Sequence, residues 1–126
     1  MSDPPRPTDA ELEILTVLWS RGPCTVREVH EVIARRRPAQ YTTMLKLMQI
    51  MAEKRLVRRD ESQRAHVYEA SRPRAWTQCQ LAGDLLERAF GGSAAEMMMG
   101  ALAARKASKK ELTEIRRLLD QMEERR

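Results

Sequence analysis

A Ser or Thr followed three residues later by Glu occurs at four places in this 126-residue chain, each time before apolar residues at helical spacing. In such a capping box the hydroxyl accepts a hydrogen bond from the Glu amide, and the Glu side chain accepts one from the Ser or Thr amide. Each box therefore predicts where a helix begins. The boxes are Thr8 with Glu11, Thr25 with Glu28, Ser93 with Glu96, and Ser108 with Glu111.

The first part of the chain predicts three helices followed by a β-hairpin. The helices are expected over residues 9–20, 26–36 and 40–54. One apolar stripe follows the third helix: Met44, Leu47, Met48 and Met51. Two strands are then expected, at 56–59 and 65–69, around a polar turn. This order is that of a winged helix-turn-helix domain, with the hairpin as its wing, and we assign residues 1–72 to it.

Three further helices are predicted for residues 73–126, after a hinge at 71–74. The second of them, over 94–106, is expected to turn Met97, Met98, Ala101 and Leu102 inward. The last carries apolar residues at the 3-4-3 spacing of a coiled-coil seam. We therefore predict a mostly α-helical chain whose C-terminal arm pairs two copies. The residues expected in that interface are Trp76, Leu86, Phe90, Met98, Leu102, Leu112, Ile115, Leu119 and Met122.

Positive charge is concentrated in the middle of the chain. Residues 35–74 hold eleven Lys or Arg and four acidic residues, whereas the whole chain has a net charge of +5. A basic segment of this kind is either a solvated surface or a footprint for a polyanion such as nucleic acid. Charge alone leaves both interpretations open.

The sequence offers no recognisable catalytic or metal-binding motif, so we expect neither an enzyme, a cofactor nor a metal site. Its two histidines are interpreted as a surface residue of the second helix, His30, and a wing-strand residue, His66. Cys24 and Cys79 lie far apart and are expected to be buried apolar groups rather than a disulfide. The N-terminus lacks an apolar leader, and no apolar run is long enough for a bilayer, so a cytoplasmic protein without membrane insertion is expected.

The face of the third helix opposite its apolar stripe is the candidate DNA-reading surface. It carries Thr42, Lys46 and Gln49, whose side chains can bond to phosphates or base edges. Arg64 ends the hairpin turn and can lie along a phosphate backbone or enter a minor groove. The Arg run at 35–37 is expected to attract phosphates generally. A plain polar helix face and a solvated turn remain the alternatives.

Several short motifs, in this order and spacing, resemble the penicillinase-repressor family (BlaI/MecI/CopY) over nearly the whole chain. They are TDAELEI at 8–14, Leu18-Trp19, TVREV at 25–29, Tyr41-Thr42-Thr43, Gln49, EKRLV at 53–57, Tyr68 and the helix at 108–119. The resemblance implies a winged helix and a cytoplasmic homodimer that binds an inverted-repeat DNA operator and blocks transcription. It places Tyr41, Thr42, Thr43 and Lys46 at DNA-reading positions. Ile50 stands where the family usually has Arg, and Arg55 where it usually has Gly.

The resemblance also bears on how repression ends. In antibiotic-responsive members a membrane metalloprotease receptor cuts an Asn-Phe bond within the fifth helix. The aligned cleavage position here is Gly100–Ala101, so we predict that this route is impaired. Copper-responsive members end in paired cysteines, which this C-terminus lacks.

Two alternatives from other classes remain. One is a winged-helix protein-interaction module that does not read DNA. The other is a ligand-gated regulator without proteolytic switching, with a pocket between the arm and the winged helix. The charge of the middle segment favours the DNA-binding reading over the first.

Overall fold

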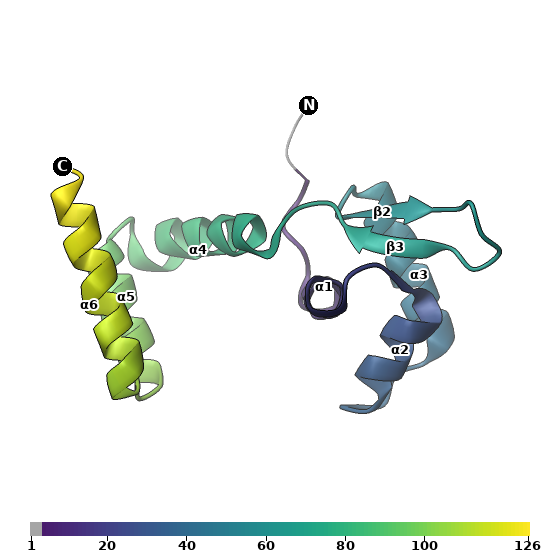
Figure 1. Cartoon of the computed structure of the whole chain (residues 1–126), viewed down its shortest axis with the longest axis horizontal. Helices are drawn as coiled ribbons and strands as arrows, with labels where there is room; N and C mark the ends of the chain where they lie inside the picture. Colours follow the sequence, from purple (N-terminus) through teal and green to yellow (C-terminus); the bar gives the residue numbers. More distant parts are fainter. Residues whose placement is uncertain (1–3) are drawn as a thin grey trace. The chain divides into compact units, whose positions relative to one another are not determined.

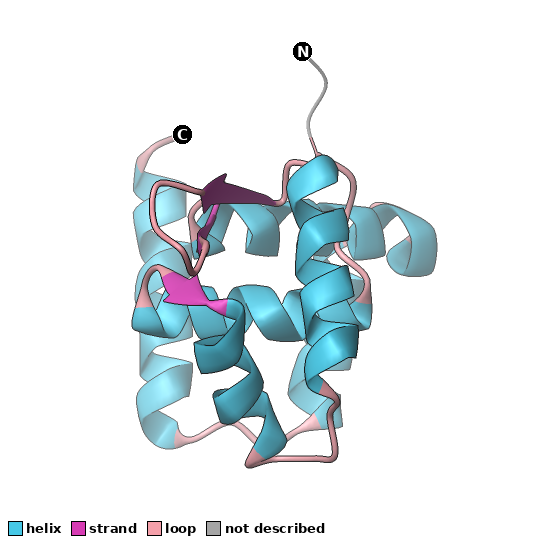
Figure 2. Cartoon of the chain, turned by 90° about the vertical axis from the view of Figure 1, so that its right-hand side faces the viewer, coloured by secondary structure: helices cyan, strands magenta, loops and turns pink. Residues whose placement is uncertain are grey.

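The computed structural model describes residues 4–126, which form six helices and a small sheet (Figures 1 and 2). The elements are α1 (Asp9–Arg21), β1 (Cys24–Thr25), α2 (Val26–Ala34), α3 (Tyr41–Glu53), β2 (Val57–Asp60), β3 (Val67–Ala70), α4 (Arg74–Phe90), α5 (Ala94–Ala104) and α6 (Lys109–Glu124). The predicted winged helix followed by three helices is confirmed. The described chain divides into two compact units, one through Ala82 and one from Gly83 to Arg126.

All four predicted capping positions start a helix. At Thr8 and Thr25 the box is reciprocal: each hydroxyl accepts from the Glu amide at 3.2 Å, and each Glu side chain accepts from the Thr amide at 2.9 Å. At Ser93 and Ser108 the hydroxyl accepts from the Glu amide at 3.1 and 3.0 Å, which is one half of the box. The helix starts that the sequence predicts are therefore correct.

The sheet has three antiparallel strands in the order β1-β3-β2. β1 was not predicted, because a two-residue strand carries no periodic pattern; it pairs Cys24 with Tyr68 and Thr25 with Val67. The hairpin strands begin one and two residues later than predicted, at Val57 and Val67. His66 consequently lies in the connecting loop and not in a strand, which corrects its predicted place.

One aliphatic and methionine-rich core joins these elements. Met44, Met48 and Met51 of α3 are at most 2% exposed, and Leu47, predicted in the same stripe, is only partly buried. They pack within a cluster of residues from α1, α2 and the sheet, including Ile14, Leu15, Leu18, Val29, Ile33, Val57 and Tyr68. Cys24 is buried as predicted, but Cys79 is exposed, which contradicts the expectation for that residue.

An ion pair with a buried carboxylate ties α1 to the end of α3. Glu11 is 1% exposed, and its carboxylate accepts a hydrogen bond from Lys54 Nζ at 2.8 Å and one from the Thr8 amide. Burial raises the pKa of Glu11, but these hydrogen bonds and the Lys54 charge outweigh it, so the pKa lies below its ordinary value. Glu11 therefore serves both as a cap of α1 and as an anchor for α3.

Residues 71–74, predicted as a hinge between two parts of the chain, lie within the first unit and bond to α1. The Trp19 indole donates to the Arg72 carbonyl at 2.9 Å, and Arg74 donates to the Ser20 hydroxyl at 3.1 Å. Further along α4, Gln80 donates to the Pro4 carbonyl at 3.0 Å. The division between the units thus falls within α4, later in the chain than the predicted boundary at residue 72.

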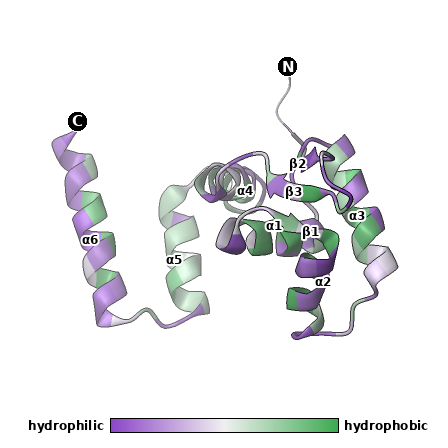
Figure 3. Cartoon of the chain, turned by 45° about the vertical axis from the view of Figure 1, so that its right-hand side comes forward, coloured by the Kyte–Doolittle hydropathy of each residue, from purple (hydrophilic) through white to green (hydrophobic). Residues whose placement is uncertain are grey.

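The second unit leaves its apolar residues largely uncovered. Neither α5 nor α6 contains a buried residue. Met98, Met99 and Leu102 of α5 are 40–63% exposed. Of the four residues expected to point inward, Met97 is half-buried, whereas Met98, Ala101 and Leu102 are exposed in the single chain, which contradicts the expectation for these three. Figure 3 shows α5 and α6 as separate helices, with apolar positions along each. No helix among residues 4–126 is long and apolar enough to cross a membrane.

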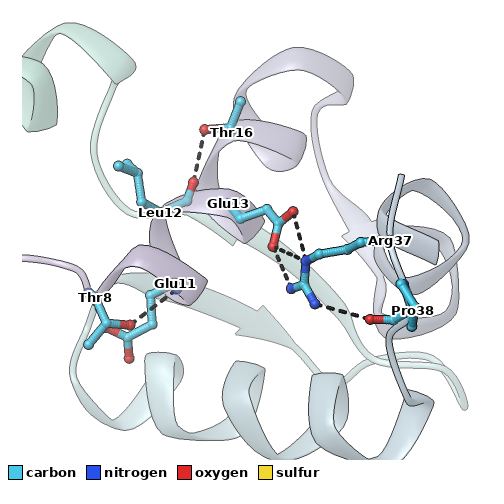
Figure 4. A network of polar contacts seen from close by, with 7 residues as sticks. All are labelled: Thr8, Glu11, Leu12, Glu13, Thr16, Arg37 and Pro38. Carbon is cyan, nitrogen blue, oxygen red and sulfur yellow. Dashed lines mark hydrogen bonds and ion pairs between the residues drawn. The ribbon is translucent and has the colours of Figure 1, made fainter. Parts of the chain in front are cut away.

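Arg37 is held by an ion pair and does not form part of a free Arg run (Figure 4). Its guanidinium donates to the Glu13 carboxylate of α1 at 2.6 and 3.1 Å, and to the Pro38 carbonyl at 3.2 Å. The hydrogen bond from Arg37 lowers the pKa of Glu13. The prediction of general phosphate attraction for the run at 35–37 is therefore corrected at Arg37, whose positive charge is paired with the Glu13 carboxylate.

The neighbouring arginines provide a matched test of this pair. Arg36→Ala and Arg37→Ala remove the same charge, but only the second breaks the bidentate contact with Glu13, so it should lower the thermal midpoint more. The difference should shrink as the pH falls through the lowered pKa of Glu13, because a protonated carboxyl no longer attracts the guanidinium. Calorimetry of both variants across pH measures this. Equal midpoints at neutral pH would contradict a stabilising role for Arg37.

Arg55 ends α3 in a left-handed conformation, with φ of 66°. The Leu56 amide donates to the Met51 carbonyl at 2.9 Å, and the Arg55 amide donates to the Ala52 carbonyl at 3.1 Å. These two bonds define a Schellman motif, in which the residue at the Arg55 position is usually Gly. The structure thus explains why a Gly is the expected residue before Leu56.

Substitution at Arg55 should reverse the usual ranking of Gly and Ala. Both Arg55→Gly and Arg55→Ala remove the side chain, so the loss of its contacts cancels in the comparison. Because Gly has no Cβ to clash at positive φ, the Gly variant should have the higher free energy of unfolding, by about 1 kcal/mol. Inside a helix Ala is the more stabilising residue. Urea unfolding measures the difference, and an Ala variant as stable as the Gly variant would rule out the left-handed cap.

Candidate nucleic-acid interface

The solvent-facing side of α3 carries the predicted reading residues. Tyr41, Thr42, Thr43, Lys46 and Gln49 are all exposed, and Tyr41 is 45% exposed. They lie on this side because Met44, Met48 and Met51, at helical spacing, take the opposite side into the core. The structure therefore places all the reading residues predicted on this helix in solvent, on one element and within about two turns.

The predicted residues line two separate surfaces of α3. Tyr41, Gln49 and Arg64 line a groove of about 750 Å³ between α2, α3 and the loop from β2 to β3. Thr42, Thr43 and Lys46 line a shallower hollow of about 400 Å³, together with Leu47 and Ile50. From the sequence we expected these residues on one face of the helix. In the structure, the two flanks of α3 carry different reading residues. Only the groove side is bordered by the wing.

Local contacts hold the acidic residues at the end of β2 and in the loop that follows it. The Asp60 carboxylate accepts a hydrogen bond from the Ser62 amide at 2.9 Å, which lowers the pKa of Asp60. Glu61 lies 3.3 Å from the Arg59 guanidinium and 3.9 Å from His66 Nε2. Arg64 is exposed and pairs with none of the carboxylates in the described part of the chain. Its charge thus remains available to an outside anion.

The groove also contains residues that the sequence analysis did not assign to the site. Arg27 and His30 come from α2, and His66 comes from the loop before β3. His30 was interpreted as a plain surface residue, but it is half-buried, and its Nε2 lies 2.8 Å from the Ala39 carbonyl oxygen. No signal in the sequence reveals this contact, because it spans the loop between α2 and α3.

Positively charged side chains outnumber carboxylates in the groove. Its lining includes Arg27, Arg64 and the two histidines, with Glu31 as its one carboxylate, and also the apolar side chain of Leu45. Lys46 adds a further cation across the exposed face of α3. Such a surface favours a polyanion that offers both phosphates and groups for hydrogen bonding.

Comparison with known proteins agrees with this arrangement. The family model described as "Penicillinase repressor" matches residues 7–121. Two relatives from Mycobacterium tuberculosis, strains CDC 1551 / Oshkosh and ATCC 25618 / H37Rv, are each named "Transcriptional regulator BlaI" and are 44% identical over 61 residues. The matched stretch covers 48% of this chain and 44% of each relative, so the chain matches less than half the length of these relatives. Because the family model extends over most of the chain, the chain belongs to the penicillinase-repressor family of transcriptional regulators.

Proposed function

We propose that this protein represses transcription by binding, as a homodimer, an inverted-repeat DNA operator through α3 and the wing. The observation that carries the proposal is the exposed polar face of α3 next to a loop whose Arg64 has no carboxylate partner in the described chain. Family membership supports the regulatory role.

Polar residues on both flanks of α3 are compatible with insertion of this helix into a DNA major groove. An α-helix in that groove contacts base edges on both of its flanks and phosphates at its margins. Thr42, Thr43 and Lys46 would then face one strand of bases, while Tyr41 and Gln49 face the other. Arg64 of the wing would meet the backbone or the adjacent minor groove.

Base reading and phosphate attraction should be lost separately. A duplex enriched from a random-sequence library serves as the specific probe, and its scrambled version as the control. Thr43→Ala should weaken binding of the enriched duplex by about 1–3 kcal/mol and leave the scrambled duplex nearly unchanged. Arg64→Ala should weaken both and reduce the salt slope by about one unit. Affinities across a salt series measure both effects.

The outcome also separates the proposed function from its rivals. Enrichment of an inverted repeat supports a dimeric reader, whereas no enrichment and no salt-dependent binding favours a protein-interaction module. If Thr43→Ala lowers both affinities alike, α3 is not the reading element. A small ligand that changes the affinity of the wild type would instead support a ligand-gated regulator.

We further propose that α4, α5 and α6 form the dimer interface. Met98, Leu102, Leu119 and Met122 are 40–54% exposed in the single chain, and Leu112 and Ile115 are half-covered. Exposed apolar residues in this number are costly in water and indicate a surface that another chain covers. Phe90 is also half-covered, and its ring lies close to Gly100 of its own chain.

Dimerisation is tested on α6 with a charge-matched control. Replacing Leu112 and Leu119 with Asp would place two charges in the proposed interface and should give monomers. Replacing Thr113 and Gln121 with Asp adds the same charge elsewhere on the helix and should leave the dimer intact. Sedimentation velocity of both double variants measures the oligomeric state. A dimer that persists after the Leu substitutions would contradict the proposal.

Gly100 bears on the proposed resistance to receptor cleavage. Gly100 and Ala101 lie inside α5, and a Cβ on Gly100 would lie 3.3 Å from the Phe90 ring. An Asn-Phe pair at these positions would therefore require the Phe90 ring to shift. The absence of the Asn-Phe pair thus coincides with close packing between Phe90 and Gly100. We propose that a receptor protease specific for Asn-Phe acts slowly on this chain.

A further inference from the structure

We propose that His30 of α2 is a positioning residue that fixes the start of α3 and thereby sets sequence discrimination; this rests on the proposed function. Its imidazole is the one side chain of α2 that binds the backbone just before α3. The contact is the 2.8 Å approach of His30 Nε2 to the Ala39 carbonyl oxygen. Because a carbonyl only accepts, Nε2 carries the proton and donates it.

The start of α3 lacks the capping box that fixes the starts of α1 and α2. α1 and α2 begin with reciprocal capping boxes at Thr8 and Thr25. α3 begins after Gln40, whose side chain makes no capping hydrogen bond. The first backbone bond, from the Met44 amide to the Gln40 carbonyl, is 3.2 Å long. The first turn of α3 therefore depends on contacts from outside the helix.

His30 supplies two such contacts at adjacent positions. Besides its bond to Ala39, its ring lies edge-on to the Tyr41 ring, with centroids 5.8 Å apart and an interplanar angle of 85°. One side chain thus holds the residue before the cap and the first residue of the helix. Both rings line the groove that the wing borders. Tyr41, Thr42 and Thr43 all belong to the turn that His30 holds in place.

A loosened first turn should affect base contacts more than phosphate contacts. Hydrogen bonds to base edges need a fixed side-chain geometry, whereas phosphate attraction is long-ranged and tolerant of small shifts. Loss of the His30 contacts should therefore lower the ratio of specific to non-specific affinity. It should do so without removing any of the groove's arginines.

Four substitutions separate the hydrogen bond from the ring and from the fold. The amide nitrogen of Gln can reach as far as imidazole Nε2, whereas that of Asn, one carbon shorter, cannot. His30→Ala and His30→Asn should each lower affinity for the enriched duplex about tenfold, with the scrambled duplex changed less than about twofold. His30→Gln should recover most of the discrimination, and His30→Phe should recover only the part due to the ring.

Amide hydrogen exchange gives a readout independent of DNA. Exchange at Met44 should be faster in His30→Ala than in the wild type and slower again in His30→Gln. If the wild type enriches no duplex, the proposed function fails, but the exchange experiment still tests His30. Unchanged discrimination and exchange in His30→Ala would overturn the inference. So would equal behaviour of the Gln and Asn variants, or a parallel loss of both affinities with a lower melting temperature.

Discussion

The burial of Met44, Met48 and Met51 is the constraint on which the rest of the first unit depends. These side chains are at most 2% exposed and share one core with α1, α2 and Tyr68 of β3. Because they occupy one side of α3, every polar residue of the helix is turned to solvent. Methionine suits this place, since its flexible side chain fills irregular space between helices and sheet. The candidate interface is therefore a direct consequence of core packing.

The ends of α3 are held by other elements rather than by the helix itself. At its start, His30 of α2 contacts Ala39 and Tyr41. At its end, Lys54 pairs with the buried carboxylate of Glu11 in α1, and Arg55 takes the left-handed turn into β2. The helix with the reading residues is thus oriented through contacts with α1 and α2. The position of the DNA-reading residues therefore depends on the packing of the whole first unit. The left-handed conformation of Arg55 adds a modest backbone strain.

The second unit differs from the first in how little apolar surface it buries within one chain. A short chain buries a limited core, and here the first unit contains nearly all of it. α5 and α6 have no buried residue, although both carry apolar side chains along their length. In the proposed homodimer, pairing with another copy would cover these residues.

The order of the helices and of the two wing strands, the capped helix starts and the polar face of α3 all follow from the amino-acid sequence. These features depend on local chemistry: a capping hydroxyl at Thr8 or Thr25, and the apolar period that includes Met44 and Met48. Tertiary structure alone decided that Arg37 pairs with Glu13, that His30 binds Ala39, that Cys24 joins a strand and that Thr43 and Tyr41 line different surfaces. Each of these depends on which groups from separate elements come within a few ångströms. Periodicity and composition carry no information about that distance, because it is set only when the helices pack.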